Sequence, residues 1–212
     1  SFWHSNEKAM GIVDILVVVL AYLLGSLSFA VIVSKAMGMA DPRSYGSGNP
    51  GATNVLRSGK KKAAVLTLLG DALKGLVAVV IAKCLWDAGH ITEATVAWVS
   101  VAVLVGHMWP VFFGFKGGKG VATAVGVLFA LSWPVALICT IVWLIMAFGL
   151  KISSLAALVA TVLSPILAWY FIDESSWCWA VLVIAVLVLY RHKSNIQNLL
   201  SGNESKIGGS SK

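Results

Sequence analysis

Residues 41–57 form a polar segment that is rich in glycine, serine and asparagine. Glycines let backbone N–H groups turn toward one point and let a ligand approach closely. Arg57 adds a planar cationic fork that suits a phosphate group. Further donors come from the side chains of Ser47, Asn49, Thr53 and Asn54. The segment therefore predicts a cradle for an oxyanion, in preference to a flexible surface loop whose basic residues only set membrane topology.

A second glycine-rich segment, residues 106–123, surrounds Lys119 with three glycines just before a predicted helix. The N-terminus of a helix favours an anion, because its N–H groups are free and its dipole end is positive. Lys116 and Lys119 would add positive charge. A glycine follows Lys119, so the segment lacks the GxxxxGK[ST] pattern of a Walker A loop and does not predict ATP hydrolysis. It predicts a second phosphate site; the alternative is a tight turn whose lysines set topology.

His107 lies in an apolar segment, about one turn before the polar end of that segment. An isolated histidine on an apolar helix is more often a packing residue than a catalyst. Histidine also suits proton transfer, so the role of His107 stays open between an orienting group and a general base. Asp71 and Lys74 stand three residues apart in another apolar segment and can pair on one helix face. Charges inside membrane segments are functional by default. No metal site is expected, since no second ligand stands near His107 at suitable spacing.

Two more polar elements follow apolar segments. Ser153 and Ser154 open a predicted helix, where they either cap that helix or donate to a ligand. Residues 191–196 contain His192 and Asn195 next to two basic side chains. This second element either anchors the chain at the membrane surface or contributes to the same phosphate site.

The composition predicts a membrane protein. Hydrophobic residues make up 58% of the chain and charged residues 12%, and the mean hydropathy is +0.88, whereas a soluble domain carries about 25% charged residues. The net charge of +7 resides mainly between apolar runs, which indicates membrane orientation rather than nucleic-acid binding. The three cysteines lack CxxC spacing and are expected to be buried as small hydrophobic residues.

Seven apolar runs approach the roughly 20 residues that a membrane helix needs. The run after residue 119 is too long for one crossing and is divided at the Ser132-Trp133-Pro134 turn, because proline favours a helix start there. The fourth run is short for a full crossing. The predicted spans are residues 11–36, 63–86, 94–115, 119–131, 133–148, 153–171 and 177–190.

The connections between these spans alternate between basic and acidic or neutral. By the positive-inside rule the basic connections are cytoplasmic, so the N-terminus is predicted outside and the C-terminus inside. All four polar elements then end on the cytoplasmic face. A transporter of organic phosphates, the competing hypothesis, would need polar groups near the bilayer midplane. A receptor that binds an anionic ligand without turnover is a third hypothesis.

The chain is predicted to hold one membrane domain, residues 11–207. Residues 1–10 are expected to be a flexible or non-native segment, and residues 208–212 a flexible tail. The first residues lack a basic region, so no cleavable signal peptide is expected.

Several of these motifs together resemble the PlsY family of bacterial acyl-phosphate:glycerol-3-phosphate acyltransferases. The resemblance rests on Gly25 and Ser26 in the first span, on residues 46–55 with Arg57, and on residues 106–123 and 190–196. It covers about residues 11–207. A serine and three lysines within residues 58–62 depart from the pattern. The HxxxxD pair of another acyltransferase class is absent, because Phe112 and Gln197 stand five residues after the two histidines concerned.

The resemblance implies a seven-helix bacterial inner-membrane enzyme with its active site on the cytoplasmic side. It would move an acyl chain from acyl phosphate to the 1-hydroxyl of glycerol 3-phosphate, at the first step of phospholipid synthesis, with no cofactor, and we expect a monomer. Its partners would be these two substrates and membrane lipid. The expected catalytic residues are His107, Ser47 and Asn195, with the base left open between His107 and a substrate phosphate oxygen. The expected phosphate-binding residues are Ser47, Asn49, Thr53, Asn54, Arg57, Lys116, Lys119, Ser153, Ser154 and His192.

Overall fold

The structure is a computed structural model that describes residues 9–208, and its regular secondary structure within that range is entirely helical. Four of the described helices are long and apolar enough to cross a membrane, and six spans result if each of two bent helix pairs counts as one. The all-α membrane class is therefore confirmed. The expectations for the two chain ends concern residues 1–10 and 208–212, of which residues 1–8 and 209–212 lie outside the described residues.

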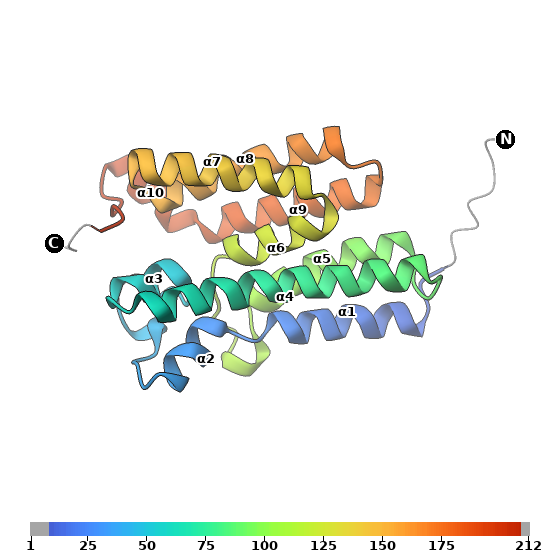
Figure 1. The fold of residues 1–212 in the computed structure, drawn as a ribbon, viewed down its shortest axis with the longest axis horizontal. Coiled ribbons are helices and arrows are strands. Elements are labelled where there is room, and N and C mark those ends of the chain that lie inside the picture. Colours follow the sequence, from blue (N-terminus) through green and yellow to red (C-terminus); the bar gives the residue numbers. More distant parts are fainter. Residues whose placement is uncertain (1–8, 209–212) are drawn as a thin grey trace.

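The helices form two layers with one short helix between them (Figure 1). Helices α1, α4 and α5 pack against one another in the first layer, and α7, α8 and α9 form the second, with α6 joining α4 to α7. Two 3-10 turns, η1 (Pro42–Ser44) and η2 (Val111–Phe113), lie in the connections. The helix bounds are α1 Ile12–Gly25, α2 Phe29–Ala36, α3 Ala52–Arg57, α4 Lys61–Asp87, α5 Glu93–Met108, α6 Val121–Leu131, α7 Trp133–Leu150, α8 Ser153–Phe171, α9 Ser175–Arg191 and α10 Lys193–Ser201.

The first predicted span, residues 11–36, is a broken helix. Helix α1 stops at Gly25, and α2 continues at an angle of 45° to it. Gly25 lies so close to α5 that an added Cβ would stand 2.0 Å from the carbonyl oxygen of Val103. Between the two helices the carbonyl oxygen of Leu27 accepts a hydrogen bond from Lys74 Nζ at 2.9 Å. The break therefore exposes backbone polar groups to a charged side chain of α4.

Helix α6 occupies the fourth predicted span, residues 119–131, but has only 11 residues. At about 1.5 Å per residue it covers roughly 16 Å, about half of a bilayer core of some 30 Å. The predicted division of the long apolar run is confirmed, since α6 ends before Ser132 and α7 begins with Pro134 in its first turn. A Cβ added to Gly126 would stand 1.9 Å from the carbonyl oxygen of Ala72, so α6 and α4 touch through their backbones.

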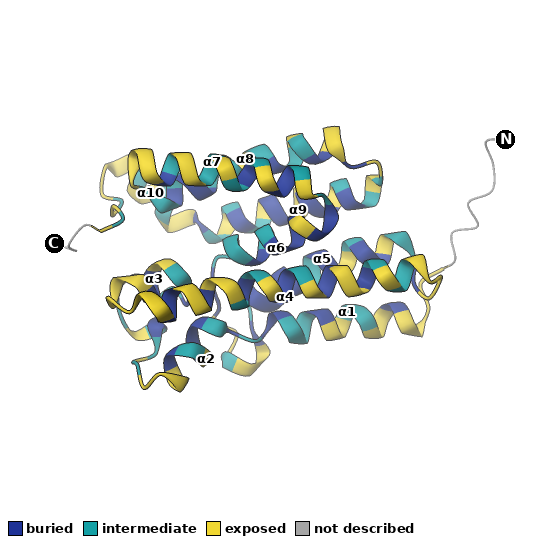
Figure 2. Cartoon of the chain, viewed as in Figure 1, coloured by how far each residue is buried: buried dark blue, intermediate teal, exposed yellow. Residues whose placement is uncertain are grey.

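The outward faces of the helices are apolar and exposed (Figure 2). Only 22% of each span formed by α7 and α8 is buried inside the protein, and Phe148 and Trp169 are each 78% exposed. Leaving so much apolar surface in water would be unfavourable by about 25 cal/mol per Å². These faces therefore meet lipid, and the chain is a multi-pass integral membrane protein.

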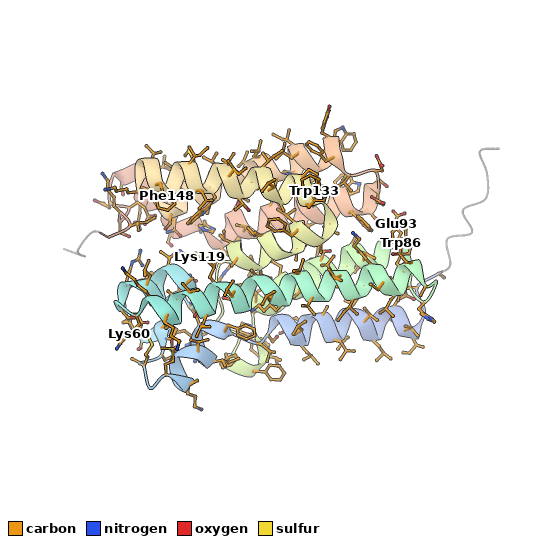
Figure 3. The ribbon with its side chains drawn as sticks, in the orientation of Figure 1. Lys60, Trp86, Glu93, Lys119, Trp133 and Phe148 are labelled. Carbon is orange, nitrogen blue, oxygen red and sulfur yellow. The ribbon has the colours of Figure 1, made fainter. Side chains whose placement is uncertain are left out.

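Several short elements gather at one end of the bundle. Helices α2, α3 and α10 lie there, opposite the turn between α4 and α5 (Figure 1). Lys60 lies at this end, Trp86 and Glu93 lie at the other, and Lys119 lies between the two layers (Figure 3). The short helices α3 and α10 were not predicted from the sequence, because both are too short for a clear apolar period and α10 is mainly polar.

Candidate active site

Asn54 organises the first glycine-rich segment. Its side-chain amide donates hydrogen bonds to the carbonyl oxygens of Pro42 at 2.8 Å and Tyr45 at 3.1 Å, and its oxygen accepts one from the Ser47 N–H at 3.1 Å. Gly46 has a φ of +56° and touches this amide oxygen, so a side chain there would collide with it. Asn54 is 1% exposed. Its amide thus shapes the loop from within, and Asn54 can serve a ligand only by holding the loop in place.

Other polar side chains of this segment face outward. Ser47, Thr53 and Arg57 are exposed, and Asn49 is half-buried. Thr53 and Arg57 stand four residues apart on α3, so they share one face of that helix. The Arg57 guanidinium donates to the hydroxyl of Ser205 at 3.0 Å, which ties α3 to the chain after α10. The segment therefore presents a hydroxyl and a cationic group to the outside while Asn54 fixes its backbone.

The second glycine-rich segment folds back on the end of α5. The N–H groups of Gly117 and Gly118 donate to the carbonyl oxygens of Met108 at 3.1 Å and His107 at 3.2 Å. Arg191, at the end of α9, donates to the carbonyl oxygens of Gly118 at 3.2 Å and Gly117 at 3.0 Å. Added Cβ atoms would stand 2.0 Å from His107 O at Gly117 and 2.5 Å from His107 Nε2 at Gly118. Only glycine therefore fits at these two positions.

Lys119 joins this segment to the start of α10. Its ammonium donates a hydrogen bond to Asn195 Oδ1, 76 residues away, and Asn195 Nδ2 donates to Glu204 Oε2 at 3.0 Å. Burial lowers the pKa of Lys119; the Glu204 carboxylate opposes that effect, and Arg191 adds to it. Lys116, three residues earlier, is exposed. The predicted site residues Lys119 and Asn195 are thus brought into direct contact, whereas Lys116 lies outside this contact.

His192 and Ser154 are buried, whereas Ser153 is half-buried. His192 is 3% exposed, and its Nδ1 donates to the carbonyl oxygen of Val188 at 2.7 Å.

The N-cap of α8 is Ile152, so the capping alternative for Ser153 and Ser154 is wrong. Ser154 is buried, and its hydroxyl has no hydrogen-bond partner among the described residues. This hydroxyl is therefore available to another group.

The side chain of His107 belongs to a buried charged cluster with Asp71 and Lys74. Lys74 Nζ lies 3.1 Å from Asp71 Oδ1, which confirms the predicted pairing of these two residues. It also lies 2.9 Å from His107 Nδ1. The Thr123 hydroxyl of α6 donates to the carbonyl oxygen of Asp71 at 2.9 Å, so three helices meet at this cluster.

Two residues of this region were not singled out from the sequence. Arg191 was expected only as part of a basic run, yet it clamps the second glycine-rich segment. Nothing in the sequence marked Glu204 as a site residue, because a lone acidic residue after a short helix is common. Among residues 9–208 no group of three or more His, Cys, Asp or Glu side chains could hold a metal ion.

The fold and these contacts define a class of protein: a multi-pass helical membrane protein whose polar segments converge at one end of the bundle. A family model described as glycerol-3-phosphate acyltransferase matches residues 15–202. The chain belongs to the glycerol-3-phosphate acyltransferase family, as the sequence motifs predicted.

Individual relatives agree with this assignment. The chain is 67% identical to a glycerol-3-phosphate acyltransferase of Neisseria meningitidis serogroup C, over 93% of this chain and 98% of that protein. It is 61% identical to one of Chromobacterium violaceum, over 90% of this chain and 93% of the other.

Two solved structures share the fold. Both are crystal structures of PlsY (YgiH), an integral membrane glycerol 3-phosphate acyltransferase. The glycerol 3-phosphate form matches with a TM-score of 0.84 at 41% identity, and the lysophosphatidic acid form with 0.83 at 40%. Each match covers 91% of this chain and 94% of the solved chain. At this identity the similarity extends beyond the fold to the family.

Proposed function

We propose that this membrane acyltransferase moves a fatty acyl group from acyl phosphate to the 1-hydroxyl of glycerol 3-phosphate, giving lysophosphatidic acid and inorganic phosphate. The contact between Lys119 and Asn195 carries the proposal, because it unites two segments that the sequence marked independently as polar and phosphate-suited. Arg57 reaches the same region through Ser205, next to Glu204. The solved relatives in glycerol 3-phosphate and lysophosphatidic acid forms supply the substrate and product.

The reaction forms one carbon–oxygen bond and breaks another. The glycerol hydroxyl oxygen attacks the acyl carbonyl carbon, the bond from that carbon to the phosphate oxygen breaks, and phosphate leaves with the bonding pair. The hydroxyl proton passes to a base, which is either His107 or a phosphate oxygen of a substrate. Acyl phosphate is a mixed anhydride and needs no activation by ATP. Positioning and electrostatic stabilisation of the developing charge supply most of the rate.

We assign the phosphate groups to the cationic and hydroxyl side chains around the Lys119–Asn195 contact. Lys119 and Arg57 neutralise phosphate charge, and Asn195 and Ser47 orient the reacting groups. Asn54 acts through the loop that it holds. Ser154 has the free buried hydroxyl noted above. The remaining expected phosphate contacts are those of the exposed or half-buried side chains of Asn49, Thr53, Lys116 and Ser153, and of the buried His192.

We also propose seven crossings with the N-terminus outside and the C-terminus in the cytoplasm of a bacterial inner membrane. The alternation of basic and acidic connections supports this topology. Helix α6 covers only about half of the bilayer core. It completes a crossing in this topology when the polar segment before it, residues 114–120, is reached by water from the cytoplasmic side. The active site then faces the cytoplasm, where glycerol 3-phosphate is soluble and the acyl chain stays in lipid.

Phosphate release is the experiment that tests the activity. The purified protein in detergent or lipid receives palmitoyl phosphate and glycerol 3-phosphate, with palmitoyl-CoA as a parallel donor. Release that requires both substrates, with lysophosphatidic acid formed and the CoA thioester inert, is the expected result. Folded protein that shows no turnover with either donor would overturn the proposal, and uptake of glycerol 3-phosphate into sealed vesicles without chemical change would establish a transporter instead.

A further inference from the structure

Lys83 is a charged side chain inside a membrane segment that the proposed reaction does not use. It lies in the last part of α4, which ends at Asp87. Its Nζ donates a hydrogen bond to the carbonyl oxygen of Ala130 at 2.7 Å, and within residues 9–208 it forms no ion pair with a carboxylate. An ionisable residue in a membrane segment is a functional candidate whose partner must be identified. The partner of Lys83 is a helix end.

Ala130 belongs to the last turn of α6, which ends at Leu131. The final carbonyl groups of a helix lack an N–H partner within it, and they form the negative end of the helix dipole. A cation near that end is stabilising, but the last turn of α6 contains no basic residue of its own. Lys83 therefore supplies from α4 the cation that the sequence of α6 lacks.

Helices α4 and α6 lie in backbone contact and run in the same direction. Ala72 of α4 meets Gly126 of α6, and further along both helices Lys83 meets Ala130. The two helix dipoles therefore point the same way, and parallel dipoles side by side repel, most strongly in the low dielectric between membrane helices. The Lys83 ammonium offsets part of this repulsion at the negative end of α6.

Trp177 of α9 also contacts the Lys83 ammonium. Nζ lies over the Trp177 ring, 5.5 Å from its centre, at a distance suited to a cation–π contact. The ring itself is fixed, since Trp177 is 3% exposed and its indole N–H donates to the carbonyl oxygen of Glu93 at 3.2 Å. Lys83 thus connects the end of α6 to helices of both layers of the bundle.

The opposite end of α6 lies in the candidate active site. Its N-cap, Gly120, follows Lys119, whose ammonium contacts Asn195. The first N–H groups of a helix and the positive end of its dipole favour an anion. Figure 3 shows Lys119 before α6 and Trp133 just beyond its other end. Because α6 is one unbroken helix of 11 residues, a tilt or shift at its C-terminal end also moves its N-terminus.

We propose that Lys83 is a positioning residue, which holds the C-terminal end of α6 and thereby keeps the N-terminus of this helix, about 16 Å away, in the place where it binds a substrate phosphate. For the identity of the anion this rests on the proposed function. Lys83 does not touch the substrate, so it affects the binding of phosphate more than the acyl transfer step. Loss of its contact lets α6 tilt, and the anion then meets fewer N–H groups at once.

Binding of inorganic phosphate tests this position without turnover. The Kd is measured by isothermal titration calorimetry in detergent well below the Tm, with glycerol 3-phosphate as a second probe. Lys83→Met keeps the length of the side chain but removes the charge and the donor, and is expected to raise the phosphate Kd about three- to tenfold. Lys83→Arg keeps the charge, the donor and the contact with the aromatic ring, and its Kd should stay within about twofold of that of the unaltered protein.

Steady-state kinetics separate binding from the chemical step. In Lys83→Met the KM for glycerol 3-phosphate should rise with the phosphate Kd, while kcat falls less than about threefold. A folded Lys83→Met protein with an unchanged phosphate Kd would overturn the inference even where acyl transfer is confirmed, and so would an unaltered protein that binds neither probe. If Lys83→Met does not fold, Lys83→Gln, which keeps a neutral donor, takes its place under the same criterion. The expected Kd shift in a protein without acyl transfer would overturn only the proposed function.

Asp14→Asn is the matched control for stability. The Asp14 carboxylate accepts hydrogen bonds from the Thr92 N–H at 2.9 Å and the Thr95 hydroxyl at 2.6 Å, and so ties α1 to the start of α5. Asp14→Asn should lower the Tm and leave the phosphate Kd unchanged, because these partners do not belong to α6. An equal rise of the Kd in Asp14→Asn and Lys83→Met would show that Lys83 acts only through general stability, and the positioning role would fail.

Discussion

Asn195 donates a hydrogen bond to the carboxylate of Glu204 at 3.0 Å while its oxygen accepts one from Lys119. A carboxylate of the protein thus lies beside the cationic and amide groups that we assign to substrate phosphate. Glu204 is half-buried and follows α10 in a segment tied to α3 by Arg57 and Ser205. On this assignment, substrate phosphate and the Glu204 carboxylate compete for the same donors.

Neutralising this carboxylate should improve phosphate binding. We expect Glu204→Gln to lower the apparent KM for a phosphate substrate about two- to fivefold, the range of a partly exposed ion pair, with kcat nearly unchanged. Initial rates over a series of glycerol 3-phosphate concentrations measure this apparent KM. Asp173→Asn, which removes an exposed carboxylate beyond α8, is the matched control and should leave KM unchanged. A raised KM in Glu204→Gln would mean that Glu204 holds Asn195 in its working position instead.

Substrate binding should weaken at alkaline pH through Lys119. Burial lowers the pKa of this lysine, so it loses its charge as pH rises through that lowered value, earlier than an exposed lysine would. The apparent KM for phosphate substrates is therefore expected to rise within a series from about pH 7 to pH 10. Lys119→Arg keeps the charge throughout and should give a flat KM over that range. Parallel profiles for the two proteins would show that Lys119 does not titrate in the site.

Removing the guanidinium of Arg57 should weaken phosphate binding strongly. Hydrogen bonds to charged groups contribute about 1.5–3 kcal/mol, so Arg57→Ala is expected to raise the apparent KM for at least one phosphate substrate by about tenfold or more. Arg57 is exposed, and within residues 9–208 its side chain hydrogen-bonds only to Ser205, so the fold should persist. Lys60→Ala removes an exposed cation two residues beyond Ser58 and is the charge-matched control. Equal kinetics for Arg57→Ala and unaltered protein would exclude Arg57 from the site.

The sequence predicted the membrane class, the division at Ser132 and the Asp71–Lys74 pair, because each depends on composition or on spacing within one helix. The contact of Lys74 with His107 depends on how α4 packs against α5, over a separation of 33 residues, and no local pattern encodes it. The Lys119–Asn195 contact is of the same kind. The polar residues marked the segments of Lys119 and Asn195 as candidate site segments, and the fold showed that the two segments are in contact.

Asn54 illustrates the other limit of sequence reasoning. An asparagine among glycines suggests a ligand donor, yet the same residue type can satisfy the backbone of its own loop. The structure shows the second behaviour, since the amide serves Pro42, Tyr45 and Ser47. Composition cannot separate these roles, because both require a small polar side chain next to flexible backbone.

The contact between α4 and α6 leads to a stability prediction. A Cβ on Gly126 would stand 1.9 Å from the carbonyl oxygen of Ala72, and that neighbour is backbone, which cannot rotate away. Gly126→Ala must therefore separate the two helices, and overpacking of this kind costs about 1–3 kcal/mol. The Tm of the detergent-solubilised protein is expected to fall, measured by thermal unfolding followed by fluorescence.

Gly149 provides the matched control for this change. It lies in α7 with nothing within 4 Å of an added Cβ. Alanine is favoured over glycine inside a helix by about 0.5–1 kcal/mol, so Gly149→Ala should hold or raise the Tm. Because α6 carries the second glycine-rich segment at its N-terminus, Gly126→Ala should also displace Lys119 from Asn195 and lower kcat. A Gly126→Ala protein with unchanged Tm and kcat would show that α4 and α6 do not touch through their backbones.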